Sequence, residues 1–440
     1  MKKGTSKLKN PNLELLAPAG NMLKLQTALA YGADAVYLGI PDFSLRVRIN
    51  DFDLNGIKVA LKYAHERGQK VYITVNIFAH NKHFNKLEAY LRKLKPLGVD
   101  AFIVADPGVL SLIKKILPRP ELHLSTQANC TNLAAARFWF SQGVSRIVLG
   151  REVTLAEIKQ IHRALPKLEL EYFIHGAMCM AYSGRCFLSK MFVNRSGNLG
   201  DCAQPCRWQY DVNRYTIKAK GHEEELELVE EEHGAYLLNS KDLCLLKQLP
   251  ELIKAGVTSF KIEGRAKSVY YQATVCAIYR RALNLIAKKT AAPKLKKELT
   301  YLYQELETKL VHRGYTTGFL LSDKADQNIV NSHNKSAWEF CGQAIKISKA
   351  KNNHSNLLFK VHNTIKLGDE IEIIGFDYDI IKMKLKKLLS AKTQEELTEA
   401  HGGGGSQECL LELGKEASLP EFAVIRRKLS PESIKVKSKI

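Results

Sequence analysis

Eight short, mostly apolar runs separated by amphipathic stretches constrain the fold of this chain more than any other feature. Uninterrupted apolar strands are typical of a parallel sheet that is buried on both faces. The stretches between them carry a helical period, as over 54–67 and 85–97. An α/β fold of the TIM-like (β/α)8 barrel type is the simplest architecture with eight such repeats, and an open doubly wound sheet is the alternative. The runs are ELLAPAG (14–20), AVYLG (35–39), VYITVN (71–76), AFIVAD (101–106), LHLSTQ (122–127), RIVLG (146–150), LEYFIHG (170–176) and SFKIEG (259–264).

The pattern of the sequence predicts four parts. Residues 1–13 are expected to be a flexible basic N-terminus, and residues 14–268 the barrel. Between the seventh and eighth runs, residues 177–258 form a cysteine-rich insertion, much longer than an ordinary strand-to-helix connection, on the barrel face where active sites lie. A helical extension is expected over 269–334, and short strands separated by turns predict a small β-barrel domain over 335–440.

Basic residues are in large excess. The 440 residues include 66 Lys and Arg against 45 Asp and Glu, which gives a formal net charge of +21. This charge favours a polyanionic partner, either nucleic acid or an anionic membrane surface, although it also promotes solubility. No uncharged apolar run reaches the roughly eighteen residues that cross a membrane, and Pro11 follows the basic start where a signal peptide would have its apolar core. We therefore expect a cytoplasmic protein without a membrane partner.

Five of the nine cysteines fall in the insertion. Cysteines in a reducing cytosol are free thiols or ligands, since disulfides are rare there. Converging thiolates can bind zinc or an iron–sulfur cluster, whereas scattered cysteines pack as small apolar residues. The wide gap between the first two favours a [4Fe-4S] cluster over zinc, because zinc ligands are usually paired at two to four residues. The five are Cys179, Cys186, Cys202, Cys206 and Cys244.

The residues around these cysteines resemble those of the peptidase U32 family, also called collagenase-like proteases. In length and in its C-terminal β region the chain is most similar to the branch of tRNA 5-hydroxyuridine hydroxylases. The shared motifs, which together cover most of residues 14–270, are HGAMC (175–179), SGRCxxS (183–189), GxCxxxCR (200–207), LLAPAG (15–20), YGADAVYLG (31–39), VYITVN (71–76) and SFKIEGR (259–265).

This resemblance implies a function and a cofactor. It implies a TIM-like barrel that holds a [4Fe-4S] cluster on four cysteines and hydroxylates wobble uridine 34 of tRNA at C5 without dioxygen. Prephenate is implied as the oxygen source and tRNA as the partner, and an electron-transfer partner is possible. Carried over by motif position, the cluster ligands are Cys179, Cys186, Cys202 and Cys244, with Cys206 as the substitute for Cys202.

Two other functions stay open beside this one. The family name allows a collagenase-like peptidase, and the same barrel allows a hydroxylase of another RNA or of a small molecule. The sequence contains no GxSxG, HExxH or P-loop motif, so the peptidase alternative has little support from its motifs.

Polar residues at the ends of predicted strands are the candidate catalytic residues. Glu263 and Arg265 alternate with Lys261 in the eighth run, where they either meet substrate or form an internal ion pair. An arginine suits a dicarboxylate such as prephenate, or a phosphate. Asn76 and Gln127 end the third and fifth runs.

His175 ends the seventh run beside the cysteines. It is either a proton donor, a hydrogen-bond donor to cluster sulfur, or a satisfied core histidine.

Arginines and an aromatic residue accompany the cysteines. Arg185, Arg195, Arg207 and Trp208 form a candidate RNA site, because arginine binds phosphate and an aromatic ring stacks on an unpaired base. Packing of the insertion accounts for Trp208 equally well.

Overall fold

A computed structural model gives the fold of the protein. The predicted flexible N-terminus lies almost entirely outside the residues that this structure describes. These are 13–45, 50–179, 181, 185–208, 217–218, 225–226, 239–322, 326–328, 333–334, 336–349, 355–403, 407–413 and 419–430.

Eight parallel strands close into a barrel, as predicted. All eight apolar runs form strands, and each pairs with the next in parallel register. The last strand pairs with both the seventh and the first, which closes the ring. The strands are β1 (Glu14–Pro18), β2 (Ala35–Gly39), β3 (Lys70–Val75), β4 (Ala101–Val104), β5 (Leu122–Leu124), β6 (Arg146–Val148), β7 (Glu169–Ala177) and β11 (Val257–Ile262).

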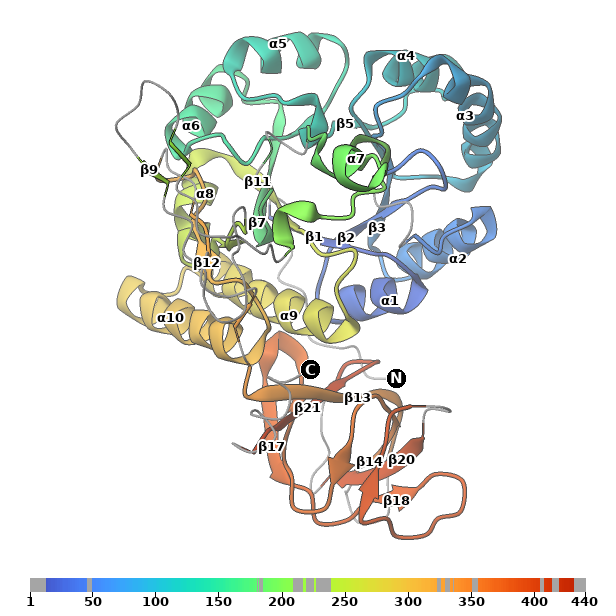
Figure 1. Ribbon diagram of the computed structural model, residues 1–440, viewed down its shortest axis with the longest axis vertical. Coiled ribbons are helices and arrows are strands. Elements are labelled where there is room, and N and C mark those ends of the chain that lie inside the picture. The colour runs from blue at the N-terminus through green and yellow to red at the C-terminus, as the bar shows by residue number, and fades with distance from the viewer. Residues whose placement is uncertain are drawn as a thin grey trace.

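Helices surround the ring (Figure 1). Several begin at a side chain that accepts a hydrogen bond from the first turn, as Asn21, Asp53 and Asp106 do. Such capping satisfies backbone N–H groups that the helix itself leaves without acceptors. The helices are α1 (Met22–Ala30), α2 (Leu54–His65), α3 (Asn81–Leu94), α4 (Pro107–Ile116), α5 (Leu133–Ser141), α6 (Leu155–Ala164) and α8 (Leu249–Ala255), with 3-10 turns η2 (Lys95–Leu97), η3 (Thr126–Ala128) and η7 (Leu246–Gln248).

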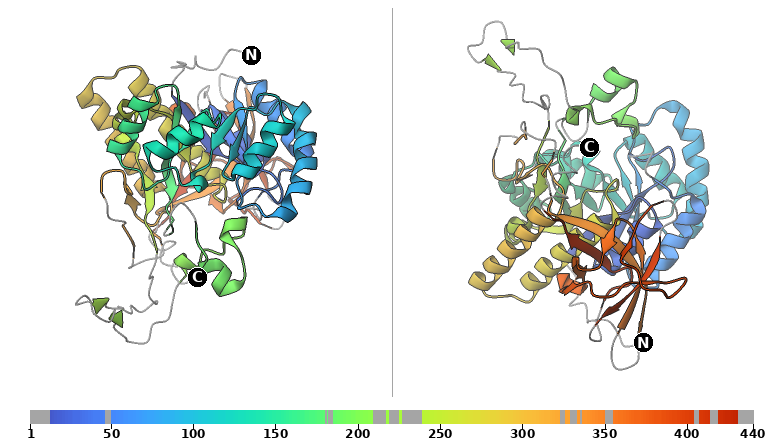
Figure 2. Two further views of the ribbon diagram at one scale, coloured as in Figure 1. Left: turned by 90° about the horizontal axis from the view of Figure 1, so that it is seen from above. Right: turned by 60° about the horizontal axis from the view of Figure 1, so that its bottom comes forward.

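The insertion contributes short elements. α7 lies at one end of the barrel, over its opening in Figure 1 and apart from the ring of helices in Figure 2. β10 pairs antiparallel with β7 and so extends the sheet outside the barrel, and β12 pairs with β10. The elements of the insertion are α7 (Leu188–Val193), η5 (Gly197–Leu199), η6 (Pro205–Arg207), β8 (Ile217–Lys218), β9 (Glu225–Leu226) and β10 (Asp242–Cys244), whereas β12 (Tyr315–Thr316) belongs to a later part of the chain.

Two long helices, α9 (Val269–Ala287) and α10 (Ala292–Lys309), lie between the barrel and the C-terminal sheet (Figure 1). One buried side chain ties the two parts together. The hydroxyl of Tyr31, at the end of α1, donates to the carbonyl of Ile374 at 2.8 Å and accepts the backbone N–H of Val424 at 3.0 Å. None of the helices that the structure describes is long and apolar enough to cross a lipid bilayer.

The predicted C-terminal β domain is confirmed as an antiparallel sheet. Seven strands pair in the order β17-β16-β21-β13-β14-β20-β18 around a core of their own, and β15 pairs with β19. In the part of the chain that the structure describes, the two outer strands are not paired with each other. The elements are β13 (Trp338–Lys349), β14 (Ser355–Val361), β15 (Ile365–Lys366), β16 (Glu370–Ile374), η9 (Phe376–Tyr378), β17 (Ile380–Lys384), β18 (Leu389–Ser390), β19 (Glu399–Ala400), β20 (Glu408–Leu413) and β21 (Val424–Lys428).

Charged side chains are buried inside the barrel. Lys261 Nζ lies 2.6 Å from Glu171 Oε1, and Arg146 Nη1 lies 3.3 Å from Glu171 Oε2. Arg146 also pairs with Glu14. Burial alone would raise the pKa of Glu171, but Lys261 and Arg146 more than offset this and hold it below its ordinary value. The interior therefore depends on matched charges, since an ion taken from water is costly unless it is paired.

The substitution Lys261→Met should test this dependence. It removes one of the cations that face the buried Glu171 carboxylate, so we expect the free energy of unfolding to fall by about 3 kcal/mol. Because the double variant Glu171→Leu/Lys261→Met removes both partners, it should be more stable than Lys261→Met. Denaturant unfolding near neutral pH measures both. A single variant as stable as the unchanged protein would contradict the expectation.

Candidate functional site

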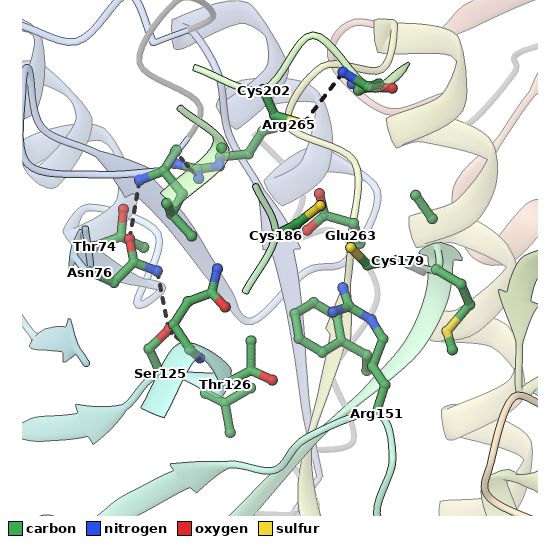
Figure 3. Close-up of a pocket in the computed structure, with 18 of the residues that line it drawn as sticks. Thr74, Asn76, Ser125, Thr126, Arg151, Cys179, Cys186, Cys202, Glu263 and Arg265 are labelled. Atoms are coloured by element: carbon green, nitrogen blue, oxygen red, sulfur yellow. Dashed lines mark hydrogen bonds between the residues drawn. The ribbon is translucent and has the colours of Figure 1, made fainter. Parts of the chain in front are cut away.

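A pocket opens where the carboxyl ends of the barrel strands meet (Figure 3). It has about 1190 Å³ of empty space, including the solvent at its mouth. Side chains that follow four different strands line it. Because parallel strands bring their carboxyl ends to one rim, residues distant in sequence meet there. Those lining the barrel side include Tyr37, Thr74, Asn76, Ser125, Gln127, Arg151, Lys261, Glu263 and Arg265.

Four cysteines of the insertion line the same pocket: Cys179, Cys186, Cys202 and Cys206. Burial raises the pKa of the Cys206 thiol, Arg207 lowers it, and the nearby Cys179, Cys202 and Cys186 thiols raise it further. The four thiols thus share one pocket and influence one another electrostatically. Among the described residues, no three His, Cys, Asp or Glu side chains lie in an arrangement that could hold a metal ion.

Local hydrogen bonds hold the cysteine loops against the barrel. The Cys186 N–H donates to Asn198 Oδ1 at 3.2 Å, and the carbonyl of Asn198 accepts the N–H of Phe78, just after β3, at 3.2 Å. Gln204 N–H donates to Cys202 Sγ at 3.3 Å. Gly200 follows η5 with φ of 89°, a left-handed conformation that glycine adopts without strain.

Cys244, one of the four ligands that the resemblance implies, lies apart from the other three. It is buried on β10, where it stands opposite His175 of β7, and its sulfur lies 3.7 Å from the Tyr279 hydroxyl. Burial raises its pKa to about 11. Cys244 does not line the pocket, and Cys206 takes its place beside the other three cysteines.

His175 also lies outside the pocket, packed against Tyr271, Tyr279 and Tyr315 with ring centroids 5.4–5.8 Å away. Burial lowers its pKa to about 3, so the imidazole is neutral. This position does not support the predicted roles as a proton donor or a hydrogen-bond donor to cluster sulfur, and it agrees with the alternative of a core histidine.

The candidate residues on β11 reach the pocket in different ways. Lys261 forms the internal ion pair that the sequence allowed as an alternative. Glu263 accepts a hydrogen bond from the Tyr37 hydroxyl at 3.3 Å, and Arg265 donates to the carbonyl of Leu45. Both lie just beyond the end of β11 and line the pocket, so their predicted roles in substrate binding stay open.

Asn76 and Gln127 line the pocket but differ in their partners. Asn76 accepts the Leu45 N–H at 3.2 Å and donates to Ser125 Oγ at 3.1 Å, so both ends of its amide brace the pocket wall. The Gln127 side-chain oxygen is buried and has no hydrogen-bond partner. Of the two, Gln127 is the one available to a ligand.

Sequence reasoning missed Arg151. It follows β6, lines the pocket, and stacks over the Phe173 ring at 3.8 Å from the ring centroid. A charged residue directly after the sixth apolar run was the available signal.

The predicted RNA-binding residues fall into two groups. Arg207 lines the pocket, and Arg185 donates to the carbonyl of Gln127 at 3.4 Å. Arg195, by contrast, pairs with Asp201 at 3.0 Å, and Trp208 donates to the carbonyl of Ala203 at 3.2 Å. Arg207 thus stands at the pocket and Arg185 contacts a residue that lines it, whereas Arg195 and Trp208 hold the insertion together.

Exposed apolar side chains on and beside α7 were not predicted. Phe187, Met191 and Phe192 are 70%, 77% and 54% exposed. Large apolar groups gathered on a surface mark an interaction site more often than isolated ones do.

Comparison with known proteins places the chain in a family. The model of peptidase family U32 matches residues 20–330. The chain belongs to the peptidase U32 family. It is similar to the tRNA hydroxylation protein P of Haemophilus influenzae, with 36% identity over 429 residues that cover 87% of this chain and 89% of that protein.

Two further U32 relatives are informative. The tRNA hydroxylation protein P of Helicobacter pylori is 44% identical over 312 residues, which cover 70% of this chain and 72% of that protein. The 23S rRNA 5-hydroxycytidine C2501 synthase of Escherichia coli is 36% identical over 372 residues, which cover 83% of this chain and 54% of that protein. The predicted resemblance to the tRNA-hydroxylating branch is confirmed.

Thiol alkylation should separate the two kinds of cysteine in this U32 protein. In metal-free, reduced, folded protein, Cys179, Cys186, Cys202 and Cys206 should react with iodoacetamide well before Cys244, because Cys244 is buried whereas the other four are exposed or partly exposed. Peptide mass spectrometry at increasing times gives the order. Alkylation of Cys244 at the same rate as Cys186 would contradict the structure.

Proposed function

We propose that this protein is a tRNA-modifying enzyme that hydroxylates wobble uridine 34 at C5 without dioxygen. The observation that carries the proposal is one pocket lined by four cysteines on its insertion side and by cationic side chains on its barrel side. The relatives named tRNA hydroxylation protein P, aligned over most of the chain, support tRNA as the substrate.

The cysteine set suits a [4Fe-4S] cluster. Four thiols at one pocket provide the soft anionic donors that such clusters need. Burial raises the pKa of Cys206, and the cation of Arg207 offsets part of that rise and so opposes the loss of the thiolate, the form that binds metal. We propose Cys179, Cys186, Cys202 and Cys206 as the ligands. The cluster, when bound, supplies one-electron transfer, so an electron-transfer partner belongs to the proposal.

The cations suit a small dicarboxylate. Arg151, Lys261 and Arg265 line the pocket near its barrel end. Guanidinium groups bind carboxylates through paired hydrogen bonds, whereas the Lys261 ammonium is already paired with Glu171. We propose that Arg151 and Arg265 bind prephenate as the oxygen source, with Glu263 and Tyr37 keeping their mutual hydrogen bond beside it.

The surface beside the pocket suits RNA. Phe187, Met191 and Phe192 offer apolar faces for unpaired bases, and Arg185 and Arg207 offer positive charge for phosphates. The net charge of +21 adds a long-range attraction for a polyanion. A wobble nucleotide lies in a single-stranded loop, so it can enter such a pocket without opening a duplex. We propose the cytoplasm as its compartment, since free thiols persist there.

The peptidase alternative is less well supported. A cysteine nucleophile needs a base, most often histidine, within hydrogen-bond reach. Among the described residues that line the pocket there is no histidine.

Nucleoside analysis tests the proposed function. A deletion strain grown without oxygen, which silences dioxygen-dependent routes, should lose 5-hydroxyuridine and its derivatives from total tRNA. The intact gene should restore them, and a gene encoding Cys186→Ser should not. Unchanged nucleosides in the deletion strain, measured by mass spectrometry, would refute the function.

The ligand set has its own test. Protein purified without air should contain iron and acid-labile sulfide, and Cys206→Ser should lose both. Cys244→Ser is the matched control and should keep them, because Cys244 lies outside the pocket. The opposite result would restore the set predicted from sequence.

A further inference from the structure

The side-chain oxygen of Gln127, a residue that lines the pocket, is a buried polar atom without a hydrogen-bond partner. Gln127 lies in η3, directly after β5, and only 7% of it is exposed. It lines the pocket, and its Oε1 is enclosed without a hydrogen bond. A buried carbonyl oxygen without a donor costs free energy, so such a group is expected where a ligand supplies the missing donor.

Hydrogen bonds fix the backbone turn that carries the Gln127 side chain. The Gln127 N–H contacts Ser125 Oγ at 3.4 Å, and Asn76 donates to that same oxygen at 3.1 Å. The Gln127 carbonyl accepts from Arg185 at 3.4 Å. Asn129 closes the turn in a left-handed conformation, with its N–H donating to the carbonyl of Thr126 at 3.0 Å. The amide is thus presented from a fixed turn, not from a free loop.

The chemistry of a carboxamide narrows the choice of ligand. Its oxygen accepts and its nitrogen donates along a single edge, so its complement is a group with one donor beside one acceptor. Uracil has this edge in N3–H and the adjacent carbonyl. A carboxylate has acceptors alone and leaves Oε1 without a donor, and Arg151 and Arg265 already offer it better partners in the same pocket.

We propose that Gln127 binds the Watson–Crick edge of the target pyrimidine, which enters the pocket unpaired. This inference rests on the proposed function and assigns its base-reading residue. Hydrogen bonds at N3 and O4 leave the C5–C6 side of the ring facing away from Gln127 and open to reaction. A half-turn of the amide exchanges donor and acceptor and would match cytosine, the base in the name of the E. coli relative.

A pair of RNA hairpins tests this contact. They are identical except that one carries uridine and the other N3-methyluridine at the target position. The methyl group removes the N3–H group whose hydrogen bond Oε1 would accept, and it leaves C5 unchanged. Binding is measured by fluorescence anisotropy, and hydroxylation by mass spectrometry with protein that holds its cluster.

The unchanged protein should prefer the uridine hairpin by about tenfold or more, the range of one good paired contact to a base. Gln127→Ala and the volume-conserving Gln127→Leu should each bind uridine more weakly and lose the preference. Gln142→Ala, which alters an exposed glutamine at the end of α5 outside the pocket, is the matched control and should behave like the unchanged protein.

The outcomes separate the two proposals. If the unchanged protein binds both hairpins equally, or if Gln127→Ala keeps the preference, the role of Gln127 is wrong even where hydroxylation occurs. If loaded protein binds uridine selectively through Gln127 but never hydroxylates it, the proposed function is wrong and the contact stands. If neither hairpin binds, both proposals fail.

Discussion

The pairing of β11 with both β1 and β7 is the constraint on which the rest of the structure depends. It closes eight strands into a ring, and closure brings all their carboxyl ends to one rim. Gln127 and Glu263, far apart in sequence, line one pocket for this reason. The insertion leaves the ring after β7, and four of its five cysteines therefore line the same opening as the residues that follow the other strands.

The sequence was sufficient to predict the barrel, because buried parallel strands are continuous apolar runs that differ clearly from the amphipathic segments between them. Helix boundaries were less certain. α3 begins at Asn81 rather than near residue 85, because His83 Nδ1 accepts the N–H of His80 at 2.8 Å. Histidine is uncommon at the N-terminal cap of a helix, so residue preferences do not predict that the helix begins there. α3 ends at Leu94, where Pro96 enters a 3-10 turn.

The sequence predicted which kinds of residue form the candidate site better than it predicted where each residue lies. A cysteine-rich insertion on a barrel rim indicated where the thiols gather. The position of Cys244 away from the pocket depends on the pairing of β10 with β7, which sets it opposite His175. The sequence left the role of His175 open, and it stands among the tyrosines where the register of β7 against β11 shifts between Phe173 and His175. Such registers are tertiary facts that a single sequence does not specify.

The two hydrogen bonds of Tyr31 limit how the C-terminal sheet could be lost from the barrel during evolution. Its hydroxyl, at the end of a barrel helix, forms hydrogen bonds with strands β16 and β21 of the C-terminal sheet. A barrel that shed the sheet would uncover this phenol and the apolar surface of α1 and α9 around it. The appended unit is therefore not a detachable module, and any shortened descendant must first have made that face of the barrel hydrophilic.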